Sequence, residues 1–184
     1  MTAIKKLLIA STLFAFFIVY VIYNWSQDPT EEDVLRNTKN WSSSVEEVYG
    51  IIQRDGEWLA FYRIPHSITV VARLKQNWMG TWKMINYSGQ RGVIASVGEI
   101  LSETDDLIPW QASGYENGYI LLMSIEDPRI DDLVITANGK EYKNISFIEL
   151  AGKRFVLLDV KGTWNSFSYQ ALSKDGEVIV AYPK

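Results

Sequence analysis

The chain has 184 residues and a mass of 21.0 kDa, and its 47% hydrophobic and 22% charged residues exclude disorder along the whole length. The formal net charge of −4 disfavours proteins that bind nucleic acid through a basic surface, so we expect no nucleic-acid partner. The absence of cysteine and the single histidine, His66, exclude disulfides, thiol nucleophiles and multi-histidine metal sites. We therefore expect neither a cofactor nor a metal.

The N-terminal segment predicts a membrane anchor. Residues 7–23 follow Lys5 and Lys6 and carry no charge. At ~1.5 Å per residue this run spans roughly 26 Å, close to the hydrocarbon thickness of a bilayer. Trp25 and two nearby tyrosines lie where an interfacial aromatic belt is expected. We predict a single span at residues 4–23, within an anchor segment 1–26 that contacts membrane lipid.

Charges around the span predict its orientation. Two lysines precede it, whereas Asp28, Glu31, Glu32 and Asp33 follow, so the positive-inside rule places the N-terminus in the cytoplasm and the body outside the cell membrane. The alternative is a cleaved signal peptide. Such peptides have a shorter apolar core that ends in small residues, but bulky residues occupy positions 21–25. An uncleaved anchor is the favoured interpretation.

Residues 27–44 predict a stalk and a linker. Asp28 suits an N-cap and Pro29 the first helical position, and acidic residues follow in the first turn. The short polar helix is expected to end near Asn37, with residues 40–44 as a linker. We interpret this segment as a spacer between the bilayer and the body.

From Val45 onward, short β-branched and aromatic segments alternate with turn residues, a pattern typical of strands. Asp55-Gly56 and Asn138-Gly139 are the turns that most strongly indicate hairpins. Residues 93–101 fit either a strand or a helix, and 102–115 are interpreted as a connection. The predicted strands are residues 47–53, 57–64, 67–75, 81–87, 119–125, 133–137, 141–150, 154–160, 167–172 and 177–182.

The spacing of these strands indicates a mainly β fold. An N-terminal transmembrane helix and a short stalk helix are followed by two small packed β halves, at residues 45–110 and 111–184. The second half is expected to be sandwich-like, with an immunoglobulin-like topology as one option.

Several motifs carry a resemblance to a known group of proteins. Residues 57–62 read E-W-L-A-F-Y and precede M-G-T-W-K at 79–83, while residues 171–179 read A-L-S-K-D-G-E-V-I. A further pair, G-Y-I at 118–120 and D-P-R-I at 127–130, lies between them. They resemble the two halves of small, uncharacterised, membrane-anchored extracytoplasmic proteins of Gram-positive bacteria, although Thr81 interrupts a Gly-Trp pairing and Ser173 is a further departure. Because that group has no assigned activity, the resemblance implies topology and fold only.

Carboxylates offer the main route to an enzyme. Glu99 or Glu103 paired with Asp105 or Asp106 would suit a cell-wall glycan hydrolase, which needs two carboxyl groups about 5–10 Å apart. A second acidic cluster at residues 126–132 matches no calcium-loop spacing, and Pro128 interrupts it. His66 stands alone after Pro65, without a nucleophile motif. Solvated turns are the favoured interpretation of both clusters, and no residue is assigned a catalytic role.

Tryptophans offer the main route to a binding site. Trp78 and Trp82 flank the Met79-Gly80 turn, which could present both indoles on one edge, and tryptophan is enriched at interfaces. Packing within a small β core is the competing role. The favoured function is a non-enzymatic, membrane-tethered extracytoplasmic module that binds a membrane-protein or cell-wall partner, and the alternative is the glycan hydrolase.

Overall fold

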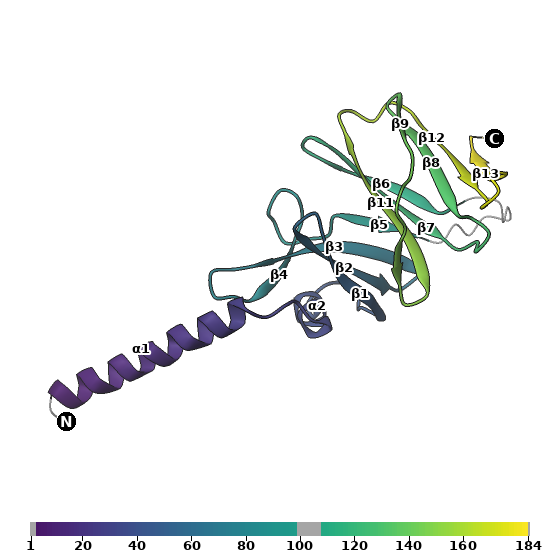
Figure 1. Cartoon of the computed structure of the whole chain (residues 1–184). Helices are drawn as coiled ribbons and strands as arrows, with labels where there is room; N and C mark the ends of the chain where they lie inside the picture. The colour runs from purple at the N-terminus through teal and green to yellow at the C-terminus, as the bar shows by residue number, and fades with distance from the viewer. Residues whose placement is uncertain (1–2, 99–107, 184) are drawn as a thin grey trace.

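A computed structural model describes residues 3–98 and 108–183, and it is mainly β, as the sequence predicts. A long N-terminal helix leaves a body built of antiparallel sheets (Figure 1). The elements are α1 (Ala3–Trp25), α2 (Glu31–Thr38), β1 (Glu47–Arg54), β2 (Glu57–Ile64), β3 (Ile68–Gln76), β4 (Trp82–Ile85), β5 (Ala95–Val97), β6 (Trp110–Tyr115), β7 (Gly118–Ile125), β8 (Asp132–Ala137), β9 (Lys140–Tyr142), β10 (Ile148–Leu150), β11 (Lys153–Lys161), β12 (Phe167–Leu172) and β13 (Val178–Tyr182).

The strands form three sheets. Sheet A has the order β1-β2-β3-β4, with β5 pairing along β3 beside β4. Sheet B has the order β10-β11-β7-β6, and sheet C the order β13-β12-β8-β9. Figure 1 shows sheet B in the middle, with sheet A toward α1 and sheet C at the far end. The body is a stack of three β layers.

Sheet B is buried on both faces. Ile120 and Leu122 of β7 join the hydrophobic cluster shared with sheet A, whereas Leu121 and Met123 join the cluster shared with sheet C. Successive side chains of a strand point to opposite faces, so a strand between two layers must be apolar at nearly every position. The apolar run at 119–125, which only Ser124 interrupts, has this cause.

Two tight hairpins confirm the predicted turns. Asp55 and Gly56 have φ angles of 52° and 80°, and Asn138 and Gly139 have φ angles of 54° and 74°. Two consecutive positive φ angles match the right-handed twist of the flanking strands, and Asn, Asp and Gly adopt them at low cost. These turns set the register of β1 with β2 and of β8 with β9.

The stalk expectation is wrong in two respects. Thr30 is the N-cap of α2, because its hydroxyl and backbone form a capping box with Asp33. The helix also packs on sheet A, where Val34 is fully buried and the Asn37 amide donates to the Trp82 carbonyl at 3.1 Å and accepts from the Met84 N–H at 3.3 Å. A helix with buried contacts to a sheet is part of the body, not a spacer.

Three strand assignments also change. Residues 110–115, expected to be a connection, form β6, an edge strand whose half-exposed, polar sequence hid its pairing with β7. Residues 141–150, expected as one strand, supply parts of β9 and β10 in different sheets. The ambiguous segment 93–101 contains strand β5, and its last three residues lie outside the described part of the chain.

Helix α1 is long and apolar enough to cross a membrane. Its segment Leu7–Trp25 has a mean hydropathy of 2.1, and none of it is buried within the protein. The hydroxyls of Ser11 and Thr12 donate back to the Leu8 carbonyl at 2.9 Å, which satisfies the two polar side chains inside the run. A helix whose apolar side chains face outward on all sides is suited to lipid.

Candidate functional site

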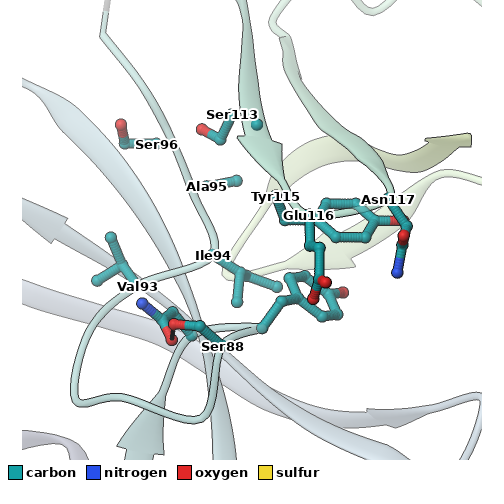
Figure 2. A pocket seen from close by; sticks show the side chains of 12 residues that line it. Ser88, Val93, Ile94, Ala95, Ser96, Ser113, Tyr115, Glu116 and Asn117 are labelled. Atoms are coloured by element: carbon teal, nitrogen blue, oxygen red, sulfur yellow. Dashed lines mark hydrogen bonds between the residues drawn. The ribbon is translucent and has the colours of Figure 1, made fainter. Parts of the chain in front are cut away.

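A groove of about 370 Å³ lies between β5 of sheet A and β6 of sheet B, and we call it the β5–β6 groove. Figure 2 shows Ala95 and Ser96 on one side of it and Ser113 and Tyr115 on the other. Residues 86–88, 93–96 and 113–117 line it.

Both strands beside the groove are edge strands. Among the described residues, β5 pairs only with β3 and β6 only with β7, so each strand keeps one unpaired edge. The residues beside them include the small Ala95, Ser96, Ser113 and Gly114, of which Ala95 is buried. An unpaired edge offers backbone donors and acceptors to an incoming extended chain.

Two stacked tyrosines line the groove. Tyr87, from the loop after β4, and Tyr115, at the end of β6, stack with ring centroids 4.8 Å apart and an interplanar angle of 29°. The hydroxyl of Tyr115 donates to Asp159 Oδ1 at 2.6 Å. Because one ring comes from each sheet, the packing of sheet A on sheet B creates the pair.

A cation lies close to each tyrosine of the pair. The guanidinium of Arg73 lies 4.9 Å from the Tyr87 centroid and forms an ion pair with Glu57 at 2.7 Å. The ammonium of Lys161 lies 5.2 Å from the Tyr115 centroid and donates to the Tyr115 hydroxyl at 2.6 Å. A cation over an aromatic face attracts the ring electrons, as Arg73 can at Tyr87, whereas Lys161 holds Tyr115 through its hydroxyl group.

The pKa shifts keep these groups in their ordinary protonation states. Burial, and then the hydrogen bond to Asp159, raise the pKa of Tyr115. Burial, and then the charge of Glu57, raise the pKa of Tyr87. The pKa of Lys161 is also raised, chiefly by its hydrogen bond to Asp159. General bases and nucleophiles need pKa values moved toward neutrality, whereas these shifts move away from it and favour hydrogen bonding.

The structure separates the two predicted tryptophans. Trp82 is only 9% exposed and packs edge-on against Trp58, with ring centroids 6.2 Å apart. Trp78, at the turn, is 70% exposed. The expectation that the turn presents both indoles on one edge is wrong, because Trp82 faces the core between sheet A and α2. A binding role for Trp78 stays a prediction.

The structure does not test the predicted carboxylate pairs. Glu99, Glu103, Asp105 and Asp106 lie outside the described residues. Within ranges 3–98 and 108–183, no cluster of three or more His, Cys, Asp or Glu side chains is arranged to hold a metal ion.

The acidic cluster at residues 126–132 and His66 lie in or beside turns at the surface. Hydrogen bonds from the guanidinium and the backbone N–H of Arg129 lower the pKa of Asp127 to about 2. The Asp132 carboxylate accepts from the N–H of Leu133 at 2.7 Å. His66 is exposed in the β2–β3 turn with a φ of 69°. These are turn and surface roles.

The groove itself was missed by sequence reasoning. Tyr115 falls in the segment expected to be a connection, and its neighbours give no periodic signal. The turn between β6 and β7 consists of Glu116 and Asn117, and neither has the positive φ angle that the Asn117-Gly118 dipeptide would have suggested. Nothing local points to Tyr87 as its stacking partner.

No protein-family model matches this chain, and no curated protein or solved structure is significantly similar to it.

Proposed function

We propose that this protein is a non-enzymatic interaction module, anchored by α1, that binds an extended segment of a partner protein in the β5–β6 groove. The observation that supports this most directly is the juxtaposition of two edge strands, each with one unpaired edge among the described residues, across a groove lined in part by Ser96 and Ser113. Extended peptides commonly bind by adding a strand to such an edge.

The chemistry of the groove suits a peptide. Backbone groups of β5 or β6 would supply hydrogen bonds that depend little on sequence, and the Tyr87–Tyr115 pair would pack against one side chain of the bound segment. Ser96 and Ser113 add hydroxyls that donate or accept. Because Arg73 and Lys161 are already engaged with carboxylates, the expected ligand segment is mainly uncharged.

The location follows from the N-terminal segment. Lys5 and Lys6 before the span and the acidic residues after it favour a cytoplasmic N-terminus and an extracytoplasmic body in a bacterial, and by resemblance Gram-positive, cell membrane. An uncleaved anchor confines the groove near the bilayer and raises its effective concentration toward neighbouring membrane or cell-wall components. These are the partners that we expect.

In-cell photo-crosslinking of the full chain tests the proposal. A photoreactive residue at Ser96 or Ser113 should capture a reproducible membrane or cell-wall protein, whereas the same residue at exposed Lys174, in the turn between β12 and β13, should not. Ser96→Lys, which places a charge on the edge, should abolish capture from Ser113. Gln53→Lys on β1, at the opposite edge of sheet A, is the matched control and should retain it.

Two outcomes would contradict the proposal. One is equal capture from Lys174 and from the groove positions. The other is turnover of purified cell wall by the full-length protein that is lost on substitution of Glu99, Glu103, Asp105 or Asp106, because it would establish the glycan hydrolase instead.

A further inference from the structure

The turn between β3 and β4 lies against the end of α1. The indole Nε1–H of Trp25, the last residue of α1, donates to the backbone carbonyl of Trp78 at 3.2 Å. At Gly80 the approach is so close that a Cβ atom would lie 2.7 Å from Asn24 Cβ. Figure 1 shows this turn at the end of the body from which α1 leaves. The tip of the hairpin is therefore at the same level as the end of the membrane-spanning helix.

Trp78 is exposed at this level. At 70%, its exposed fraction is the largest of any large hydrophobic side chain in the described part of the body, and neighbouring Trp25 is 54% exposed. Tryptophan combines a broad apolar ring with one N–H donor and prefers the interface between membrane and water. The Trp25 indole thus contacts the backbone of Trp78, and both side chains are exposed beside the end of α1.

Two lysines follow on the same hairpin. Lys75 of β3 and Lys83 of β4 are directly opposite in the register and both are exposed. Like charges in this position repel each other. No carboxylate within residues 3–98 and 108–183 forms an ion pair with either lysine. An anion placed between them would relieve the repulsion.

The acidic residues of sheet A at this end are already paired, whereas exposed Asp28, which follows Gln27 after α1, forms no ion pair among the described residues. Glu57 binds Arg73 at 2.7 Å, and Asp55 lies 3.7 Å from Arg54. Gln76 and Trp82 alternate with the lysines, so they occupy the opposite face of the hairpin, where both contact the Gln27 carbonyl. The lysine face is left with a local positive charge, although the whole chain is acidic.

The dimensions fit a lipid headgroup. Lys75 and Trp78 are three positions apart, which is at most roughly 10 Å at ~3.3 Å per residue, because β3 ends at Gln76. A headgroup layer is roughly 5–7 Å deep, and a lysine stem can extend toward it. With Trp78 at the interface, both ammonium groups would reach the phosphates of the same leaflet.

We propose that the β3–β4 hairpin is a second membrane contact, in which Trp78 enters the interface beside Trp25 and Lys75 and Lys83 bind the headgroups of anionic phospholipids. This inference rests on the proposed anchoring by α1 and deepens it. The contact fixes the orientation of the body on the bilayer and thus the direction in which the β5–β6 groove opens.

Lysine reactivity in reconstituted vesicles tests the headgroup contact. The full chain is placed in vesicles of phosphatidylcholine alone or mixed with phosphatidylglycerol, and a water-soluble reagent acylates its amines before mass spectrometry. Lys75 and Lys83 should react about fivefold more slowly in the anionic vesicles, and added salt should remove the difference. Lys140 and Lys174 on distant sheet C, both exposed, are internal controls. If the rates of Lys75 and Lys83 change between the two vesicle types no more than those of Lys140 and Lys174, the inference is overturned.

Quenching by brominated lipid tests the indole. Trp78→Phe should remove a measurable part of the quenching of the full chain, and the lost part should be larger in anionic vesicles. Lys75→Gln with Lys83→Gln should abolish that dependence on lipid charge, whereas Lys140→Gln with Lys174→Gln should retain it. Quenching that is identical in wild type and Trp78→Phe would overturn the inference. Release of the chain by alkaline carbonate would instead contradict anchoring by α1, so the two failures are distinguishable.

Discussion

The side-chain amide of Gln76 donates a hydrogen bond to the backbone carbonyl of Asn24 at 2.9 Å, and so joins the β3–β4 hairpin to the last turn of α1. Carbonyls at the end of a helix lack partners within the helix and need others. The indole of Trp82 donates to the nearby Gln27 carbonyl at 3.1 Å in the same way. Side chains of sheet A therefore cap α1, and the body is held against the end of this helix.

Gln76→Ala should loosen the body from α1. The substitution removes a neutral hydrogen bond of about 1 kcal/mol and leaves the Asn24 carbonyl with the weaker bond from the Gln27 N–H. Spin labels on cysteines introduced at exposed Ser26 and Asp55 should show a broader distance distribution in nanodiscs. The control Gln53→Ala removes an exposed glutamine on β1 and should leave the width of the distance distribution unchanged. If Gln76→Ala also leaves this width unchanged, the capping hydrogen bond does not hold the body against α1.

Gly80→Ala should displace the hairpin from α1. Gly80 has a φ of 77°, and its added Cβ would lie 2.8 Å from the backbone nitrogen of Trp25, which cannot move without shifting the helix. Gly139→Ala carries the same strain at a φ of 74° but meets no atom within 4 Å. The distance between labels on α1 and the body should change only in Gly80→Ala, although each variant loses about 1 kcal/mol to backbone strain.

Val34→Ala should destabilise the body, because α2 is part of its core. Val34 is 0% exposed against sheet A, so truncation should cost about 1–3 kcal/mol in urea unfolding of the full chain in detergent. Leu35, the next residue, is 48% exposed, and Leu35→Ala should cost less than about 0.5 kcal/mol. Equal effects of the two substitutions would mean that α2 is a spacer after all.

Two buried tyrosines should respond in opposite directions to loss of the hydroxyl. The Tyr62 hydroxyl is buried without a hydrogen-bond partner among the described residues, so Tyr62→Phe should leave stability unchanged or raise it by about 1 kcal/mol. The Tyr169 hydroxyl accepts from the N–H of Ile108 at 3.0 Å. Tyr169→Phe should therefore cost about 1–3 kcal/mol, because it leaves that buried N–H unpaired. Urea unfolding measures the stability of both variants. A loss of stability in Tyr62→Phe would mean that the Tyr62 hydroxyl does have a hydrogen-bond partner.

The carboxyl group of Asp127 should titrate near pH 2. Hydrogen bonds from Arg129 favour its charged form, so its pKa in the folded protein lies below the ordinary value. The bond therefore contributes stability above pH 4, and this contribution is lost as the pH falls toward about 2. The contribution is small, since both groups are exposed to solvent. Carbon NMR should show that the pKa of Asp127 rises toward its ordinary value in Arg129→Ala. It should stay low in the control Lys143→Ala, which removes the unrelated ion pair of Lys143 with Glu141.

Sequence patterns predicted those features that depend on neighbouring residues. The apolar run of α1 and the turns at Asp55-Gly56 and Asn138-Gly139 are local, since a lipid-facing helix needs only continuous hydrophobicity and a tight turn only permissive residues. The polar sequence of α2 predicted an exposed spacer, because the distant residues that pack against this helix cannot be recognised from its own sequence. The buried amide of Asn37 is satisfied by backbone groups of Trp82 and Met84, more than forty positions away.

Only the tertiary structure brought the candidate surfaces together. Tyr87 and Tyr115 belong to different sheets and stack because sheet A packs on sheet B. Trp78 and Trp82 flank the same turn, yet one is exposed and the other buried. Composition and local patterning determine which segments become helices and strands, because those choices depend on the backbone and nearest neighbours. Which edges stay unpaired and which side chains face solvent is decided by the packing of layers, which depends on residues far apart in the chain.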